Sequence, residues 1–544
     1  MAETGSASRR FGCPSCGGGL RYDIASKKMI CDRCGSLTAM EKLPEEPAEE
    51  MLEVTEFHCP QCGAAVYSTD TEVTSFCSFC GSDVVLTGKM GRTKRPARIV
   101  PFAVTREDCE NAYRAHLKKF ALAPTDLKKT ETISHFRPVY VPFWSYSVDA
   151  EGPAHLEGKK SYTRGEYRYE ETYDLSMDAT IREKGILYDA SSKFEDETAA
   201  MLQHTSKESV PFHPAYLSGF YAQGADVPAA TYHQEAAATA VRLFMEQMKK
   251  QFAMDSVEMK GRITENFGLP DARYAEELVM MPVWLLAHRQ GARVVYTAVN
   301  GQSGQVVCDV PVSNGRIVGV TAVLAVVLFA VLQMFLTMRP EILMALCAIL
   351  GLGIQYLFSG AQKRLAIRRN RSFEPHYGQE NEADFVGPAQ AMLKRTKDGI
   401  AVKMGAASGM GAQFRAVASA MGYTAIVLSF LVLPQIITRA GTSAERMSLV
   451  KLIMGAALLV MIIHTVRRFA QKDGGLKWPR LLSVLAVGAG FAAMMMGQVE
   501  DLVYYGCAAA MLISCGIELA IMNRDHNEYA SRPVPYFDGK EEET

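Results

Sequence analysis

Hydrophobic and polar positions divide the chain into a mixed N-terminal part and an apolar C-terminal part. Residues 1 to about 316 carry charges throughout, whereas later residues alternate long apolar runs with basic connectors. Six of these runs approach the ~20 residues that a helix needs to cross a bilayer. The pattern therefore predicts an all-α six-helix transmembrane region. We place its helices at 317–337, 341–359, 420–438, 448–466, 481–498 and 502–522.

Basic residues are concentrated in alternate connectors between these runs. Clusters of lysine and arginine follow the second run and separate the fourth from the fifth, whereas the other connectors contain few. The positive-inside rule then places both termini in the cytoplasm. The first residues contain no apolar core, so we expect no cleavable signal peptide. We expect a multi-pass protein of the cell membrane, with transmembrane helices 1–2 in 317–359, a basic cytoplasmic loop at 360–419, helices 3–6 in 420–522 and a cytoplasmic tail at 523–544.

The stretch from 95 to 315 alternates helical and strand-like patterns. Thr105 and Asp108 have the spacing of a capping box, and apolar residues on one helical face follow them. Strand-like alternation runs from 137 to about 191, and a helix is expected over 234–254. Strands then resume and lead toward the apolar part. The sequence predicts a cytoplasmic α+β domain over these residues.

Cysteine spacing adds a metal-binding prediction to this picture. The charge is nearly balanced, with 58 basic and 59 acidic residues, and so indicates no polyelectrolyte partner. Eight of the 13 cysteines form C-x-x-C pairs within the first 80 residues, a pattern that favours metal binding in a reducing compartment over disulfides. Each cysteine of the second set follows its counterpart by 46 positions, which indicates an internal duplication. The two sets are Cys13, Cys16, Cys31 and Cys34, and Cys59, Cys62, Cys77 and Cys80.

Each set is typical of a zinc ribbon. Two residues between cysteines let one tight turn present both thiolates, and the glycine that follows relieves the backbone strain of the turn. Fourteen residues between the pairs are enough for a β-hairpin that brings them together. Four thiolates leave no open position on Zn²⁺, so the site would be structural and would supply folding free energy. We expect two small β zinc ribbons at 10–40 and 57–88, two structural Zn²⁺ ions and an acidic linker at 41–56.

Alternatives at the ribbons stay open. His58 adjoins Cys59 and could replace a cysteine as ligand, and the C-x-x-C pairs could be redox motifs, although four pairs in register are unusual for that chemistry. A basic stretch at 89–98 follows the second ribbon, and Phe76 and Phe79 could stack on bases. The acidic linker would repel phosphates, however, and the phenylalanines could instead pack a small core. We favour packing and protein docking, and expect no nucleic-acid partner.

No catalytic constellation stands out in the sequence, so we expect no enzyme. It contains no phosphate-binding glycine loop, nucleophile elbow or H-E-x-x-H motif, and its histidines lack ligand spacing. Trp144 and Trp284 each follow a proline in a strand-like segment, where core packing explains them. Glu518 lies toward a cytoplasmic end of the last apolar run, where it could reach water. Anchoring is therefore the leading role for the helices.

These features together resemble a family of bacterial membrane proteins with a transcription-factor-IIB-type (TFIIB-type) zinc ribbon. The resemblance covers about residues 10–316. It rests on the two ribbons and on the stretches 140–144 (YVPFW), 211–221 (PFHPAYLSGFY), 282–304 and 309–311. Some members look associated with PspA-like or flotillin-like envelope proteins, which implies a scaffold or recruitment role in envelope stress. Members commonly have fewer spans than the six predicted here.

Three hypotheses for function follow. The first is a zinc-binding integral membrane protein that acts as a cytoplasm-facing scaffold or recruitment factor, with the lipid bilayer and envelope proteins as partners. The second is a membrane-tethered nucleic-acid-binding regulator, and the third is a transporter that uses the six-helix region. The acidic linker argues against the second hypothesis, and the lack of buried charge in the apolar runs argues against the third.

Overall fold

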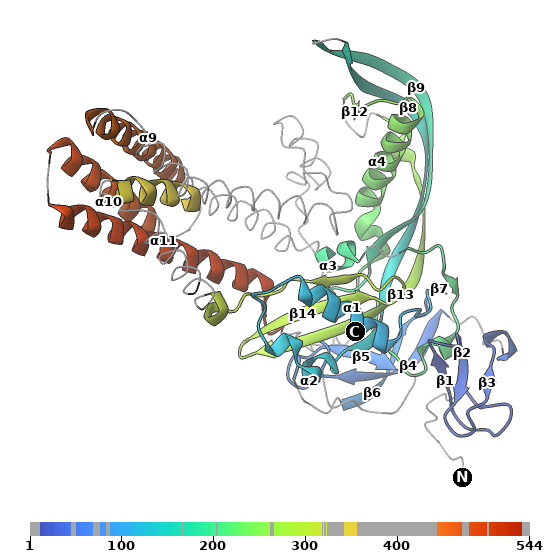
Figure 1. The fold of residues 1–544 in the computed structure, drawn as a ribbon. Helices are drawn as coiled ribbons and strands as arrows, with labels where there is room; N and C mark the ends of the chain where they lie inside the picture. The colour runs from blue at the N-terminus through green and yellow to red at the C-terminus, as the bar shows by residue number, and fades with distance from the viewer. Residues whose placement is uncertain are drawn as a thin grey trace. The chain divides into compact units, whose positions relative to one another are not determined.

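The chain forms two compact units in the computed structural model. Unit 1 contains the described residues up to Val310 and those from Ser531 onward, and unit 2 contains the described residues from Pro311 to Ala530. Among the described residues, unit 1 carries both cysteine sets and all of the strands, whereas the elements of unit 2 are helices (Figure 1). The described residues are 11–44, 50–68, 77–82, 87–164, 167–194, 196–202, 205–261, 266–317, 319, 323, 342–355, 443–470, 478–497 and 500–535.

Unit 1 begins with a small antiparallel sheet that surrounds the first cysteine set. β1 (Leu20–Asp23) and β2 (Lys28–Cys31) form a hairpin, and β3 (Leu37–Thr38) pairs with β2. This hairpin confirms the prediction that the spacer between the cysteine pairs folds back on itself. The three strands form a sheet of their own, separate from the rest of unit 1.

The other strands of unit 1 belong to one 13-stranded sheet. Its main path runs in the order β10-β7-β13-β8-β11-β5-β4-β6, and the remaining strands pair beside this path. The strands are β4 (Met51–His58), β5 (Ala65–Ser68), β6 (Thr87–Lys94), β7 (Arg98–Ile99), β8 (Arg137–Arg164), β9 (Tyr167–Asp189), β10 (Val210–Pro211), β11 (Tyr221–Ala222), β12 (Ser256–Met259), β13 (Arg273–Gln290), β14 (Arg293–Asn300), β15 (Val306–Cys308) and β16 (Arg532–Pro533).

The second cysteine set is therefore built into the large sheet. β4 begins at Met51, inside the stretch expected to be an acidic linker, and pairs with both β5 and β6. β5 in turn pairs with β11, which comes more than 150 residues later in the chain. The expected separation of a ribbon at 57–88 from an α+β domain at 95–315 has no counterpart in the strand pairing. Hydrogen bonds between strands far apart in sequence join the two.

Strands β8 and β9 form a long arm. They contain 28 and 23 residues and pair with each other from Phe143 to Arg164. Figure 1 shows this curved hairpin with α4 (His233–Gln251) lying along it. Apolar side chains of the arm and of α4 form one buried cluster beneath the helix. The strands and the helix expected here from periodicity are present, but the pattern did not predict the reach of the arm.

The first helix of unit 1, α1 (Arg106–Lys118), begins at the predicted capping box. The Thr105 hydroxyl accepts a hydrogen bond from the backbone N–H of Asp108 at 3.2 Å, and the Asp108 carboxylate accepts one from the backbone N–H of Thr105 at 3.3 Å. Cys109 and Leu117 lie on the buried face. The shorter helices are α2 (Thr130–Ile133), α3 (Asp196–Met201) and the 3-10 helices η1 (Met40–Lys42), η2 (Asp126–Lys128), η3 (Pro214–Leu217), η4 (Ala229–Tyr232) and η6 (Leu269–Asp271).

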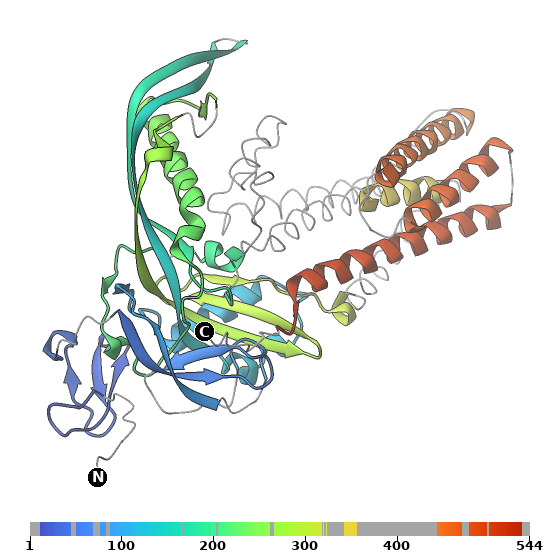
Figure 2. The same cartoon turned by 180° about the vertical axis from the view of Figure 1, so that it is seen from behind.

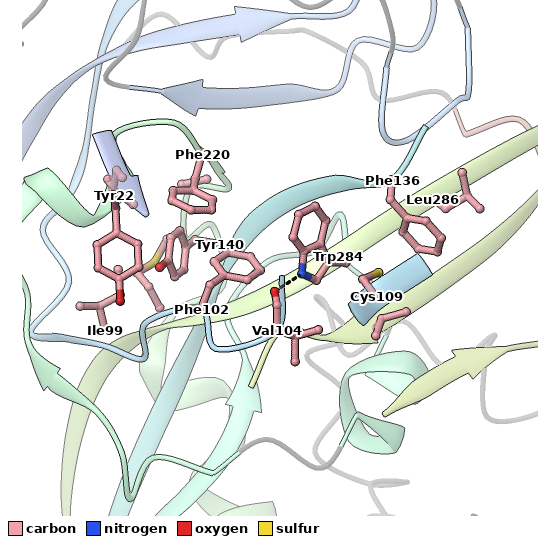
Figure 3. Close-up of a cluster of buried hydrophobic side chains, with 14 of the residues drawn as sticks. Tyr22, Ile99, Phe102, Val104, Cys109, Phe136, Tyr140, Phe220, Trp284 and Leu286 are labelled. Carbon is pink, nitrogen blue, oxygen red and sulfur yellow. Dashed lines mark hydrogen bonds between the residues drawn. The ribbon is translucent and has the colours of Figure 1, made fainter. Parts of the chain in front are cut away.

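An aromatic core lies between the small sheet and the large one (Figure 3). Phe102 stacks on Phe220 at a centroid distance of 4.9 Å and meets Trp284 edge-on at 5.6 Å. The Trp284 indole donates to the carbonyl oxygen of Val104 at 3.0 Å. Trp144, in the cluster beneath α4, donates to a backbone carbonyl in the same way, at 2.8 Å. Both tryptophans are buried and hydrogen-bonded, which confirms that core packing explains them.

Unit 2 contains α9 (Ser443–Ala470), α10 (Trp478–Met495), α11 (Asp501–Ala530) and a helix over Ile342–Gln355. Figure 2 shows α10 and α11 side by side. Among the described residues, α11 is the one helix that is long and apolar enough to cross a membrane.

The prediction of six transmembrane helices is not supported by the described part of the chain. The run at 502–522 lies within α11. Three other runs overlap apolar helical stretches that are shorter than a span within the described residues: Ile342–Gln355, Met447–Ile463 and Arg480–Met495. The runs expected at 317–337 and 420–438 lie almost wholly outside the described residues, as does the loop at 360–419.

Polar side chains are buried between α10 and α11. The hydroxyls of Ser483 and Ser514 lie 2.6 Å apart. Glu518 follows one helical turn after Ser514, Arg480 precedes Ser483 by about one turn, and all four residues are buried. The expectation that Glu518 reaches water is therefore wrong, as is the expected lack of buried charge. The reason is helical spacing, which puts Glu518 on the same face of α11 as Ser514, toward α10.

Both ends of the segment that forms unit 2 continue into strands that pair with β14. Before unit 2, β15 pairs with β14 from Thr297 to Val299. After α11, β16 pairs with β14 at Arg293 and Val294. Arg293 also donates from Nε to the Ser531 hydroxyl at 2.8 Å. The chain thus leaves unit 1 beside β14 and returns beside the same strand.

Candidate metal centre

Each C-x-x-C pair forms the same backbone turn. The residue that follows every second cysteine is a glycine with a positive φ of 68–71°, a conformation that side chains with a Cβ rarely adopt. Its N–H donates to the carbonyl of the first cysteine at 2.8–3.0 Å in all four turns. This confirms the role predicted for glycine from the spacing. The four glycines are Gly17, Gly35, Gly63 and Gly81.

The sulfur atoms of each set have the separation that a tetrahedral metal site requires. With zinc–sulfur bonds of about 2.3 Å, the edges of the tetrahedron are about 3.8 Å. All four sulfurs of each set lie within 4.8 Å of one another. Each set could therefore hold one metal ion, and the distances are consistent with zinc. The Sγ–Sγ distances are 3.7 Å for Cys13–Cys34, 3.5 Å for Cys16–Cys31, and 3.8 Å for both Cys59–Cys80 and Cys62–Cys77.

A serine hydroxyl lies against the sulfurs of each set. Ser36 Oγ is 3.1 Å from the sulfurs of both Cys13 and Cys34. Its duplicate, Ser82, has its hydroxyl 3.2 Å from the sulfur of Cys80. With a metal bound, the cysteines are thiolates, so these hydroxyls would donate to them and offset part of their charge.

The first ribbon rests on the segment around η3. The Tyr22 ring lies 5.2 Å from that of Tyr216, and the backbone N–H of Tyr22 donates to the carbonyl of Ser218 at 3.2 Å. His213 Nδ1 accepts from the N–H of Ala215, which places the proton on Nε2, 3.2 Å from the carbonyl of Pro44. We name the segment His213–Phe220 the η3 seat. It lies within the 211–221 stretch that carries the family resemblance.

The second ribbon rests on β13 and β14. The Tyr296 hydroxyl donates to the carbonyl of Phe79, and Arg289 donates from Nη1 to the Ser82 hydroxyl at 2.7 Å. Burial raises the pKa of Tyr296, which keeps its hydroxyl available as a donor. Gly81 approaches the backbone of Ala287 so closely that an added Cβ would lie 2.7 Å from its carbonyl oxygen. The strands that flank the second ribbon, β4, β5 and β6, also belong to the large sheet, whereas the strands of the first ribbon form a separate sheet.

The two metal sites differ in their exposure to solvent. All four cysteines of the second set are buried. In the first set Cys13 and Cys31 are buried, whereas Cys16 is half-buried and Cys34 is exposed. The second site is buried because the large sheet covers it. The first ribbon has only its own three-stranded sheet, which is too small to enclose all four cysteines.

Other residues singled out near the ribbons do not join the metal sites. His58 is not part of the second set's cluster, and its ring lies 3.7 Å from the Glu56 carboxylate. Phe79 is buried against the second set and so is not free to stack on a base, whereas Phe76 lies outside the described residues. In the basic stretch, Lys94 lies over the Trp144 ring at 4.9 Å. Arg95 lies over the Phe212 ring, and Arg98 donates a hydrogen bond from Nε to the Ser209 hydroxyl.

Sequence reasoning missed the residues that position the two ribbons. The η3 seat, Arg289 and Tyr296 carry no metal-ligand signal. The one available signal was the density of aromatic residues in 211–221, a short stretch with no helical or strand period. Such clusters commonly mark a packing surface, but they do not name the partner.

Two pairs of cysteine turns on short strands, each presenting four sulfurs, define a zinc-ribbon-like metal centre. Among known proteins, the chain is similar to YdjG of Bacillus subtilis (strain 168), described as uncharacterized, with 26% identity over 318 residues. The similar region covers 56% of this chain and 91% of YdjG. No family model matches the chain. No solved structure matches it either.

Proposed function

We propose that this protein is a zinc-binding, multi-pass membrane protein whose unit 1 is a cytoplasm-facing docking scaffold, as the resemblance to TFIIB-type zinc-ribbon proteins implies. The pairing of β15 and β16 with β14 is the observation that carries the proposal. Through this pairing, the chain segments before and after the apolar helices are both anchored in unit 1, which carries the two metal centres. The structural zinc ions would hold the two ribbons on the scaffold.

The strand pairing constrains how unit 2 can cross a membrane. Because β15 and β16 pair with one strand, the chain on either side of unit 2 would lie on the same side of a bilayer. A segment with both ends on one side crosses an even number of times. If α11 crosses, another segment between Pro311 and Glu500 must therefore cross in the opposite direction. The strand pairing therefore supports a multi-pass arrangement with both termini on one side.

Topology mapping tests this arrangement. Fluorescent-protein fusions at Met1 and after Thr544 should both fluoresce, as they do in cytoplasm. An epitope inserted after Gly497, between α10 and α11, should be reached by an impermeant antibody only from the opposite face. Termini on opposite sides of the membrane would refute the proposal. An epitope that is reached only from the side of the termini would show that α11 does not cross.

Docking of proteins is better supported than docking of nucleic acid. The basic side chains Lys94, Arg95 and Arg98 are engaged within unit 1, and Phe79 is buried. Much of the charge that could meet phosphates is therefore occupied. Envelope proteins of the PspA-like or flotillin-like kind remain the proposed partners, from the resemblance alone.

Crosslinking in intact membranes tests the scaffold role. Native protein should recover a defined set of envelope proteins, and a Cys13→Ser/Cys16→Ser variant that detaches the first ribbon should lose part of that set. A lysine pair outside both ribbons, Lys249→Ala/Lys250→Ala at the end of α4, is the matched control and should lose none. If both variants recover the same proteins, or if the native chain recovers none, the first ribbon is not a docking site.

The buried polar side chains of unit 2 favour transport as a second candidate function. Neither carboxylate oxygen of Glu518 has a hydrogen-bond partner in the described part of the chain. A buried ionisable residue in an apolar helix pair often marks an ion pathway. In proteoliposomes, Glu518→Gln should abolish any ion flux of the native protein, whereas Glu528→Gln, at an exposed position in the last turn of α11, should not. Native protein without flux would exclude this candidate.

A further inference from the structure

We infer that the two metal sites have different roles, with the first a reversible, thiol-reactive site and the second a permanent structural one. The duplication supplies an internal comparison. Both sites have four cysteines, the same turns and similar sulfur–sulfur distances. Equal ligands give similar intrinsic metal affinity, so any difference in behaviour must come from their surroundings. This inference concerns the metal sites alone and does not depend on the scaffold role.

Exposure is the first difference. A chelator or an oxidant must reach a sulfur atom before the metal can leave. Cys34 is exposed and Cys16 is half-buried, so a reagent can approach the first site from solvent. The cysteines of the second site are all buried, beneath Phe57, Phe79 and neighbouring apolar side chains. Reaching the second site requires that part of unit 1 opens first.

The cost of such an opening is the second difference. β4 pairs with β5 and β6 over many residues, so opening the second ribbon breaks a continuous part of the large sheet. The first ribbon has its own small sheet. The backbone N–H of Tyr22 and the carbonyl of Pro44 make hydrogen bonds to the η3 seat, and the other contacts of the ribbon are side-chain packing in the core that it shares with the large sheet. Loss of the first metal would therefore release a module and leave the sheet intact.

A peroxide would convert the first site into a disulfide. The exposed Cys34 thiolate attacks one peroxide oxygen, so that an S–O bond forms, the O–O bond breaks, and the leaving hydroxide takes a proton to become water. The Cys13 thiolate, whose sulfur is 3.7 Å away, then attacks the Cys34 sulfur. The S–S bond forms, the S–O bond breaks, and a second water leaves after protonation. Two electrons pass from the thiolates to the peroxide, and Cys13 and Cys34 would no longer be available to hold a metal ion.

Loss of the first metal has a structural consequence for the ribbon. The module contains few strand residues, and without a metal a fold of this size lacks the core to remain folded. Tyr22 would then leave Tyr216 and Ser218, and its backbone N–H would lose its acceptor. The η3 seat would become exposed, while β14 and the second ribbon would keep their hydrogen bonds.

Zinc release from the full chain in detergent micelles tests the inference. Protein loaded with two equivalents of zinc is mixed with excess chelator, and released zinc is followed by absorbance. One equivalent should leave at least about tenfold faster than the other, and the Cys13→Ser/Cys16→Ser variant should lack the fast phase. With hydrogen peroxide in place of the chelator, one equivalent should leave and mass spectrometry should find a Cys13–Cys34 disulfide.

Two readouts on the native chain keep the test decisive even if a cysteine variant misfolds. Alkylation after partial zinc release should label the first set and spare the second. Hydrogen exchange at the same point should show the Tyr22 amide unprotected and the β14 amides protected. Equal release rates, labelling of the second set first, or loss of β14 protection together with that of Tyr22 would each overturn the inference.

Discussion

Alanine at Gly81 should destabilise unit 1 more than alanine at its duplicate, Gly35. Both glycines have φ near +70°, and alanine in that region costs about 1–2 kcal/mol for either one. Their surroundings differ. A Cβ at Gly81 would lie 2.7 Å from the carbonyl oxygen of Ala287, whereas at Gly35 nothing lies within 4 Å.

The backbone of β13 has to shift to relieve the contact at Gly81, because no flexible side chain can move aside. Forcing extra atoms into a packed site typically costs about 1–3 kcal/mol. We therefore expect a cost of about 1–2 kcal/mol for Gly35→Ala and about 2–5 kcal/mol for Gly81→Ala, from the sum of strain and clash. The difference between the two isolates the packing of the second ribbon on β13.

Thermal unfolding of the full chain in detergent, followed by tryptophan fluorescence, measures this difference. Trp144 and Trp284 are buried in unit 1 and report on its core. Gly291→Ala is a further control, because Gly291 has φ of 64° with nothing within 4 Å and lies in the turn between β13 and β14. Gly81→Ala should lower the apparent Tm by several degrees more than either control. If its effect equals theirs, the second ribbon does not pack on β13 as described.

Three further outcomes are expected. Thr105→Ala should destabilise unit 1 by about 1 kcal/mol, because the cap of α1 loses its acceptor, and Thr105→Ser should restore the apparent Tm. Burial lowers the pKa of His116 and His288 below the ordinary value of 6.5. The unfolded chain therefore binds protons more readily, so stability should fall as pH drops through 6.5, and replacing both histidines by glutamine should flatten that fall in acid-unfolding curves. Arg293→Ala should loosen β16 and speed proteolysis just after Ala530, since it removes the bonds to Ser531, and unchanged cleavage would contradict that.

Features that depend on a few neighbouring residues were predictable from the sequence. The cysteine turns form because the two cysteines and the following glycine lie within five residues, and Gly17 and Gly81 have the positive φ that the spacing required. The capping box at Thr105 and the helix over His233–Gln251 follow local rules in the same way. The eight ligand candidates came from this local information alone.

Tertiary structure decided everything that depends on what packs over a residue. Strand β4 pairs with β5, which lies close to it in sequence, but β5 also pairs with β11. A local sequence pattern does not predict such a long-range partner. For the same reason the sequence could not rank the two metal sites, since their ligands are alike and only the large sheet buries one of them. Glu518 became buried because α10 covers that face of α11. Spacing along the chain sets the chemistry of a site, and only the fold sets how much of it water can reach.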